Sequence, residues 1–296
     1  MPLVSKNLNH WTLKDNQVIL SDDYRKQGLD KNNKWHKFKK ITGTRFSSIA
    51  GLSKYNTSFK TWMEMVSLFK SDMDQTLADA GNIIEGKLRI YAESVLHQKY
   101  TYHDPSSCGW DLFHDNEIFG GIIDGEPIDE NSNIDYSNGK MMLEMKTSSI
   151  DKLAYFPDVN GNLMMKKNEN NIPLIAKDGE GKKRLEWFDE NNNIKVPYEY
   201  QFQLSLYLKL RNVKKGMFII TFLTPNDYAN PAKFDPSTHE VRFVEFEIKD
   251  QDKFDAIYEN AALWYKNHIL TGISPVMTSE DKKWLDTELK RIKVEK

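Results

Sequence analysis

The stretch Lys140-Met141-Met142-Leu143-Glu144-Met145-Lys146-Thr147 decides the fold, because it predicts a strand that carries two opposite charges. It follows Asn138-Gly139, a pair typical of tight turns. Side chains at i and i+2 of a strand point to the same face, so Glu144 and Lys146 are predicted neighbours while Met145 faces the other way. Taken alone, a Glu-x-Lys pattern in a strand indicates no more than a salt bridge, so the neighbouring segments must decide its role.

A second carboxylate lies in the segment Gly120-Gly121-Ile122-Ile123-Asp124-Gly125, which we predict to end a short strand over 118–124. Its glycines allow backbone or substrate to approach closely. If the turn at 138–139 pairs the two strands, Asp124 meets Glu144 at one strand end. Two adjacent carboxylates repel each other unless a cation lies between them. Mg²⁺ prefers such oxygen ligands, so the pattern predicts a magnesium site in which Lys146 helps to activate water and to stabilise a charged phosphate.

The composition is that of a folded protein, and it excludes several other kinds of site. With 296 residues, 39% of them hydrophobic, the chain can bury a substantial core. The single cysteine, Cys108, excludes an internal disulfide or a four-cysteine metal site, and the histidines lack the spacing of zinc ligands. A net charge of −2 neither indicates nor excludes nucleic acid. The sequence has no apolar run long enough for a membrane span and no signal-peptide core, so we expect a cytoplasmic protein.

Hydrophobic periodicity predicts one domain over 41–296, preceded by a polar, irregular N-terminal extension over 1–40. A polar insertion at about 158–196 is expected to contain one or two small hairpins. The main elements of this domain are expected in the order helix, helix, strand, strand, helix, strand, strand, helix. This order predicts an α/β fold with a mixed central sheet flanked by helices.

Five segments, in this order along the chain, resemble the PD-(D/E)xK nuclease superfamily, and specifically its lambda-exonuclease/YqaJ-like viral recombinase branch. They are Thr42-Gly43-Thr44-Arg45-Phe46 with Ile49-Ala50-Gly51-Leu52-Ser53, Gly81-Asn82-Ile83-Ile84-Glu85, Gly121-Ile122-Ile123-Asp124-Gly125, Glu144-Met145-Lys146-Thr147-Ser148 and Pro197-Tyr198-Glu199-Tyr200-Gln201-Phe202-Gln203. The resemblance covers about residues 40 to 225 and implies a restriction-endonuclease-like core. Ile123 stands where the superfamily has its proline, and the last helices have no counterpart.

The resemblance implies a ligand set for Mg²⁺, for which Mn²⁺ can substitute. Asp124, Glu144 and the backbone carbonyl of Met145 would hold the first ion. Glu85 would complete the site, although a helix glutamate four residues before Arg89 is also expected as a solvated ion pair.

The resemblance also assigns residues around the substrate. Gln201 would lie beside the attacking water, and Gln203, about 200° around the helix, would be structural. Arg45 would contact a DNA phosphate. Lys37, Lys39 and Lys40 belong to a basic and aromatic run that could follow a DNA backbone, or could be a strand with its lysines in water.

The activity implied by the resemblance is a 5′→3′ exonuclease on double-stranded DNA ends, acting in recombination or repair. Its implied partners are a ring-shaped homo-oligomer and a single-strand annealing protein, with no membrane involved. Two alternatives stay open. One is an endonuclease of the restriction or repair type, in which the insertion recognises DNA. The other is a catalytically inactive DNA-binding protein, which the complete set of acidic residues and lysine argues against.

Overall fold

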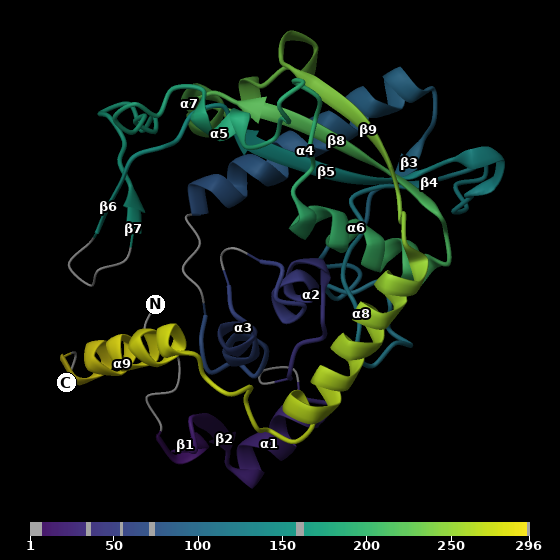
Figure 1. Ribbon diagram of the computed structural model, residues 1–296. Coiled ribbons are helices and arrows are strands. Elements are labelled where there is room, and N and C mark those ends of the chain that lie inside the picture. The colour runs from purple at the N-terminus through teal and green to yellow at the C-terminus, as the bar shows by residue number, and fades with distance from the viewer. Residues whose placement is uncertain (1–7, 34–36, 54–55, 71–74, 158–162, 295–296) are drawn as a thin grey trace.

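A mixed three-stranded sheet forms the centre of the protein (Figure 1). The computed structural model describes residues 8–33, 37–53, 56–70, 75–157 and 163–294. The sheet has the order β5 (Met142–Ser149), β8 (Lys215–Leu223) and β9 (Val241–Glu247), with β5 and β8 parallel and β8 and β9 antiparallel. In this register Glu144 pairs with Phe218 and Lys146 with Ile220.

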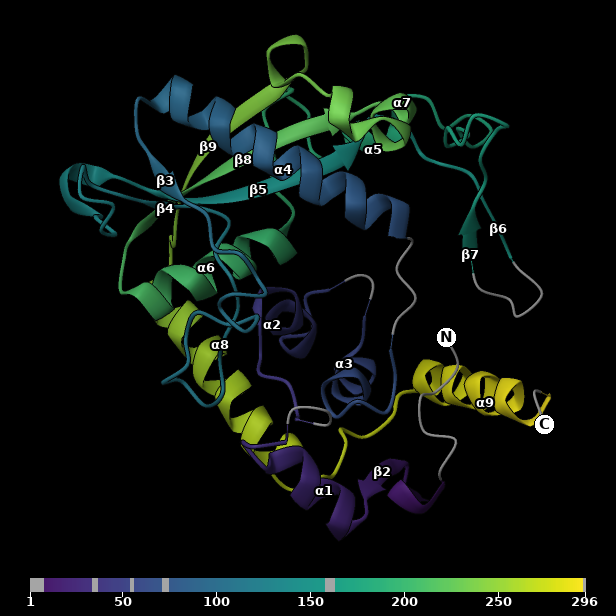
Figure 2. The ribbon, with the colours of Figure 1, turned by 180° about the vertical axis from the view of Figure 1, so that it is seen from behind.

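Helices cover both faces of this sheet, which confirms the predicted α/β class. Helix α4 (Gln75–Leu96) packs on one face, where Ile84 and Leu88 share a core with Leu143, Met145 and other side chains. Helix α6 (Tyr198–Arg211) packs on the other face (Figure 2). Because both faces are covered, β8 is a nearly continuous apolar run rather than an alternating one.

The remaining elements surround this centre. They are β1 (Trp11–Lys14), β2 (Gln17–Leu20), α1 (Asp22–Leu29), α2 (Gly43–Ile49), α3 (Ser58–Met65), β3 (Tyr100–Thr101), β4 (Glu126–Pro127), β6 (Tyr155–Pro157), β7 (Leu163–Met165), α5 (Lys182–Leu185), α7 (Pro225–Ala229), α8 (Gln251–Trp264) and α9 (Ser279–Val294). No helix in the described ranges is both long enough and apolar enough to cross a bilayer.

The N-terminal segment is not irregular, and the prediction for 1–40 is wrong over residues 8–33. Strands β1 and β2 form a hairpin that leads into α1. Trp11 and Tyr24 are buried in the main core, and the backbone N–H of Val18 donates to Ser274 Oγ at 2.9 Å. Contacts with residues near the C-terminus therefore order a segment whose own sequence is polar.

The predicted strand over 118–124 is also wrong. This segment makes isolated bridges, from Phe119 to Ile41 and from Gly125 to Leu143, and joins no ladder. Within the segment, Gly121 has a φ of 138°, which is outside the range of an extended strand. The bridge at Leu143 still brings the segment beside β5, as the turn at 138–139 predicted.

The insertion contains the expected hairpin, although its first strand begins earlier, at Tyr155. The pair β6–β7 projects from the body of the molecule (Figures 1 and 2). The pair Asn160-Gly161, whose sequence is typical of a tight turn, lies outside the described residues.

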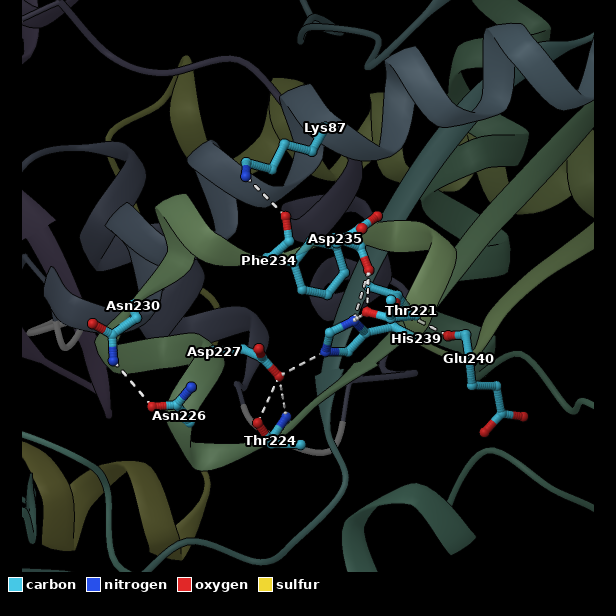
Figure 3. A network of polar contacts seen from close by, with 11 residues as sticks. Lys87, Thr221, Thr224, Asn226, Asp227, Asn230, Phe234, Asp235, His239 and Glu240 are labelled. Atoms are coloured by element: carbon cyan, nitrogen blue, oxygen red, sulfur yellow. Dashed lines mark hydrogen bonds and ion pairs between the residues drawn. The ribbon is translucent and has the colours of Figure 1, made fainter.

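A polar network fastens α4 to the loop after β8 (Figure 3). The carboxylate of Asp227, 6% exposed, accepts from the N–H and the hydroxyl of Thr224 at 2.8 and 2.7 Å. His239 Nε2 lies 3.2 Å from the same oxygen. Lys87 of α4 donates to the carbonyl of Phe234 in this loop at 2.8 Å. The loop therefore fixes α4 two residues beyond Glu85.

A second network fixes the segment that carries Asp124. Glu126 is fully buried and accepts two hydrogen bonds from Arg211, both of 2.8 Å. Tyr136 donates to it at 2.7 Å, and His103 Nε2 lies 2.8 Å away. Burial alone would raise the pKa of Glu126, but the hydrogen bonds from these partners outweigh burial and lower it. The carboxylate stays charged two residues from Asp124.

We predict that Arg211→Met lowers the free energy of unfolding by about 2–4 kcal/mol, because it leaves a buried carboxylate short of donors. Urea unfolding at neutral pH measures the loss. The matched control is Arg242→Met, which removes a half-exposed arginine paired with Glu240. Surface pairs contribute about 1 kcal/mol or less, so equal losses in the two variants would contradict the structural role of Arg211.

Candidate functional site

The site lies at the free edge of β5. This strand ends the sheet, and Met145 N donates to Asp124 Oδ2 at 2.7 Å on the side where another strand would pair. In an extended strand the N–H and C=O of one residue point to the same side. The Met145 carbonyl is therefore expected to face Asp124 as well, as the predicted ligand set requires.

Glu144 and Lys146 share one face of β5, as their spacing predicts. Lys146 Nζ donates to Glu144 Oε1 at 2.5 Å. The Glu144 side chain is completely buried, and its second oxygen, Oε2, is among the buried polar atoms of the described residues that have no hydrogen-bond partner. A buried oxygen left without a partner costs about 1–3 kcal/mol and often indicates a position for a water or an ion. The salt bridge therefore gives a partner to Oε1 of Glu144 but leaves Oε2 without one.

Glu85 reaches the same edge from α4. Burial and then the charge of Asp124 raise the pKa of Glu85 to about 8. The same two causes, in the same order, raise the pKa of Glu144 to about 8. Burial also raises the pKa of Asp124, against the effects of Lys146 and the Met145 N–H. The charge of Asp124 thus contributes to the shifts of both Glu85 and Glu144, so the three carboxyl groups lie within electrostatic reach of one another.

Lys146 is the cation among these carboxylates. Burial alone would lower its pKa, but the charges of Glu144 and Asp124 outweigh burial and raise it. Three carboxylates around one ammonium group leave an excess of negative charge when all are ionised. Protons or a metal cation can neutralise that excess.

The donor set fits Mg²⁺ in its chemistry. Among the described residues, no group of three or more His, Cys, Asp or Glu side chains is placed to hold a metal ion. Mg²⁺ needs no such cage, since it is usually bound by one or two carboxylates together with waters and substrate phosphates. Asp124 and the unpartnered Glu144 Oε2 supply two carboxylates, and an all-oxygen set favours a hard cation over zinc.

Helix α6 supplies a glutamine to the site, but it is not the one predicted. Gln203 Oε1 lies 3.4 Å from Lys146 Nζ, and the ring of Tyr200 lies 5.0 Å from the same nitrogen. Gln201 turns away and donates to the carbonyl of Val196 at 2.7 Å. The prediction that Gln201 lies beside the lysine is therefore wrong. The helical spacing of Tyr200, Gln203 and Tyr207 was the signal that could have found the correct face.

Two glycines in the predicted segments let the backbone pack closely against α6. A Cβ on Gly43 would lie 2.2 Å from Gln203 Cγ, and one on Gly121 would lie 2.6 Å from the hydroxyl of Tyr207. The positive φ of Gly121 independently favours glycine. Close packing at these points brings α2 and the Asp124 segment to the face of α6 that carries Gln203.

The predicted DNA-binding residues have different surroundings. Lys40 Nζ donates to Asp111 at 2.6 Å and to the Phe113 carbonyl at 2.9 Å within the protein. The prediction that Lys40 binds DNA is therefore wrong. Arg45 is half-buried and donates to the carbonyl of Lys40 at 3.1 Å. Lys37 is exposed, and residues 34–36 lie outside the described part. Lys39 is exposed too, although desolvation and then the charge of Arg45 lower its pKa.

A cavity of 470 Å³ lies on the α6 side of the site, and none of the four charged residues of the site lines it. Tyr200 and Gln203, the two side chains of α6 near the lysine, form one wall. Hydroxyls of α2, Lys60 of α3 and Trp284 of α9 form others. Tyr200 and Gln203 therefore stand between this cavity and Lys146.

Together, the fold and the site define an α/β protein with an acid-rich centre and one lysine at the edge of its sheet. No profile of a known protein family matches the chain. The protein described as uncharacterized protein MG373 of Mycoplasma genitalium is 44% identical over 288 residues, which cover 96% of this chain and 98% of that protein. Its homologue in Mycoplasma pneumoniae is 43% identical over 273 residues, with coverage of 92% and 93%. The chain belongs to the family of these MG373 proteins.

One solved structure, an alkaline exonuclease (LHK-Exo) from Laribacter hongkongensis, aligns with 86% of this chain and 94% of its own. The sequence identity is 12% and the TM-score is 0.44. A likeness of this level does not establish a common function, which has to be argued from the site and from the sequence segments.

The raised carboxyl pKa values predict how the metal-free protein responds to pH. A carboxyl group whose pKa rises on folding stabilises the protein below its unfolded pKa, and this contribution is lost as pH rises through the folded value. The pKa values of Glu85 and Glu144 rise from 4.5 to about 8. We therefore expect the free energy of unfolding of the unaltered protein in EDTA to fall between about pH 5 and about pH 8. This fall should exceed that of the Glu85→Gln, Glu144→Gln double variant by at least ~1 kcal/mol.

Urea unfolding of both proteins at the two pH values measures this difference. An equal pH dependence in the two proteins would show that these carboxyls do not titrate abnormally.

Proposed function

We propose that this protein is a Mg²⁺-dependent DNA nuclease. Asp124, Glu144 and Lys146 form the site at which it hydrolyses phosphodiester bonds of DNA. The observation that carries the proposal is Glu144 Oε2, a buried oxygen without a hydrogen-bond partner beside a second carboxylate and an ammonium group. A structural salt bridge alone would not require the second carboxylate or leave that oxygen bare. Hydrolysis of a phosphodiester needs both positive charge at the phosphate and a held water.

Each residue has a distinct part in this proposal. Asp124, Glu144 and the Met145 carbonyl hold the cation, and Glu85 adds a further oxygen. When bound, Mg²⁺ supplies positive charge at the phosphate and lowers the pKa of water. Lys146 is kept as an ammonium group by its carboxylate neighbours, so it donates hydrogen bonds to water or phosphate. Gln203, which contacts Lys146, orients that donor.

DNA is the proposed substrate because cations lie near α2, the helix that contributes to the cavity wall. Arg45 belongs to α2, and the charge of Arg45 acts on Lys39. Lys37 adds an exposed charge close by. Phosphate contacts of this kind supply most of the affinity of non-specific DNA binding.

Exonuclease action in the 5′→3′ direction on double-stranded ends is the finer part of the proposal. It is supported by the five ordered segments that resemble the lambda-exonuclease/YqaJ-like branch. A role in recombination or repair, a ring-shaped oligomer and an annealing partner are proposed on the same resemblance. An endonuclease on the same centre is the second candidate.

We predict that Glu144→Gln reduces Mg²⁺-dependent cleavage of linear duplex DNA by roughly a thousandfold, because several kcal/mol of charge stabilisation are lost. EDTA should abolish cleavage by the unaltered protein, and Mn²⁺ should restore it. End-labelled duplex resolved on a denaturing gel measures the rate. An unchanged rate in Glu144→Gln would place the chemistry elsewhere.

Helix α6 provides a matched control pair for the same assay. Gln203→Ala should lower the rate by about tenfold, because the lysine loses a neighbour that orients it. Gln201→Ala removes a glutamine whose side chain donates to the Val196 carbonyl, away from the lysine, and it should change the rate by less than about twofold.

Linear and covalently closed circular duplexes separate the two candidate activities. We predict that the linear duplex is degraded from its ends and that the circle persists under the same Mg²⁺ concentration. Label at the 5′ end should be released first. Cutting of the circle would favour the endonuclease, and binding of DNA without any cleavage would favour the inactive DNA-binding alternative.

A further inference from the structure

The hairpin β6–β7 stands out from the body of the molecule near the first turn of α4 (Figures 1 and 2). Its base is attached to α4, since Lys167 Nζ donates to Thr76 Oγ1 at 2.6 Å. Helix α4 carries Glu85 toward the free edge of β5. The hairpin is therefore connected to the proposed active site through a single helix.

In the described part of the hairpin, one face carries a single buried side chain, Met165, while Tyr155 and Leu163 on that same face are 42% and 71% exposed. Directly opposed residues in an antiparallel pair point to the same face. Tyr155 pairs with Met165, which is 5% exposed and packs into the core beneath. Phe156 pairs with Met164 on the opposite, outer face, and these two are 43% and 45% exposed. The outer face therefore presents an aromatic ring and a thioether side chain to solvent.

Positive charge accompanies these apolar side chains. The ladder continues past β7, because Lys166 N donates to the Ala154 carbonyl at 2.8 Å. Alternation then places Lys166 on the same outer face as Met164, and Lys166 is exposed. The segments 152–157 and 163–167 contain three lysines and no acidic residue. An anionic partner that also presents flat apolar groups matches this face.

We propose that the outer face of the β6–β7 hairpin binds an unpaired DNA strand, with a base stacked on Phe156 and a phosphate at Lys166. This inference rests on the proposed function, which makes DNA the substrate. Stacking on an exposed aromatic ring requires an unpaired base, whereas a closed duplex offers its bases only at the ends. A folded protein partner fits less well, since a few side chains on one strand pair offer far less than the roughly 1,200 Å² of a stable interface.

The test measures binding without cleavage. A fluorescent oligothymidine of about 20 nucleotides is titrated with protein in EDTA, and its anisotropy gives Kd. Phe156→Ala should raise Kd by about tenfold, because stacking contributes roughly 1–3 kcal/mol per base. Phe156→Trp should bind as the unaltered protein does. The matched control is Leu13→Ala, which removes a 56% exposed side chain from β1, separated from the hairpin by α9 in both views.

Two results would overturn the inference. One is an equal Kd for Phe156→Ala and the unaltered protein. The other is a change in sedimentation coefficient caused by Phe156→Ala, which would make the hairpin a contact between copies of this chain. The two proposals can fail separately. If the protein shows no Mg²⁺-dependent cleavage but binds the oligonucleotide through Phe156, the nuclease proposal is wrong and the hairpin proposal is supported.

Discussion

The rest of the structure depends on the enclosure of three carboxylates and one ammonium group at the free edge of β5. Each carboxyl group is driven toward its neutral form by burial and by the others, as the raised pKa values of Glu85 and Glu144 show. Lys146 offsets one negative charge through its contact with Glu144. The proposed binding of a divalent cation rests on this excess charge, which an ordinary surface salt bridge would not have.

Such a cluster must be held by the surrounding fold, because its charges would otherwise separate and hydrate. Two satisfied networks do this from opposite directions. Arg211, the last residue of α6, fixes Glu126 and hence the segment that carries Asp124. Lys87 and the loop around Asp227 hold α4, and hence Glu85, against the sheet. Both networks lie close in sequence to the residues that they position.

The surroundings of the cluster divide into two regions. On the α6 side, a cavity has Tyr200 and Gln203, the two neighbours of Lys146, on its wall. Near the first turn of α4, the β6–β7 hairpin carries apolar and cationic side chains away from the body of the protein. The chemistry and the proposed capture of a strand therefore use separate elements that share α4.

The sequence by itself determined the features that arise from local geometry. The two-residue period of a strand placed Glu144 and Lys146 on one face, and the segment of Asp124 lies beside β5 as expected, although Asn138-Gly139 belongs to a short 3-10 helix and not to a two-residue hairpin turn. The periodicity of apolar residues along the chain predicted the α/β class and the mixed sheet. These features depend on covalent geometry and near neighbours, which a short segment already contains.

Only the tertiary structure decided the features that depend on distant contacts. The face of α6 that meets Lys146 is set by how the helix packs on the sheet, so Gln203 and not Gln201 reaches the site. Lys40 pairs with Asp111, which lies 71 positions away along the chain, and the N-terminal hairpin is ordered by residues near the C-terminus. No local pattern encodes such pairings, because each depends on the position of a partner that only the folded chain brings near.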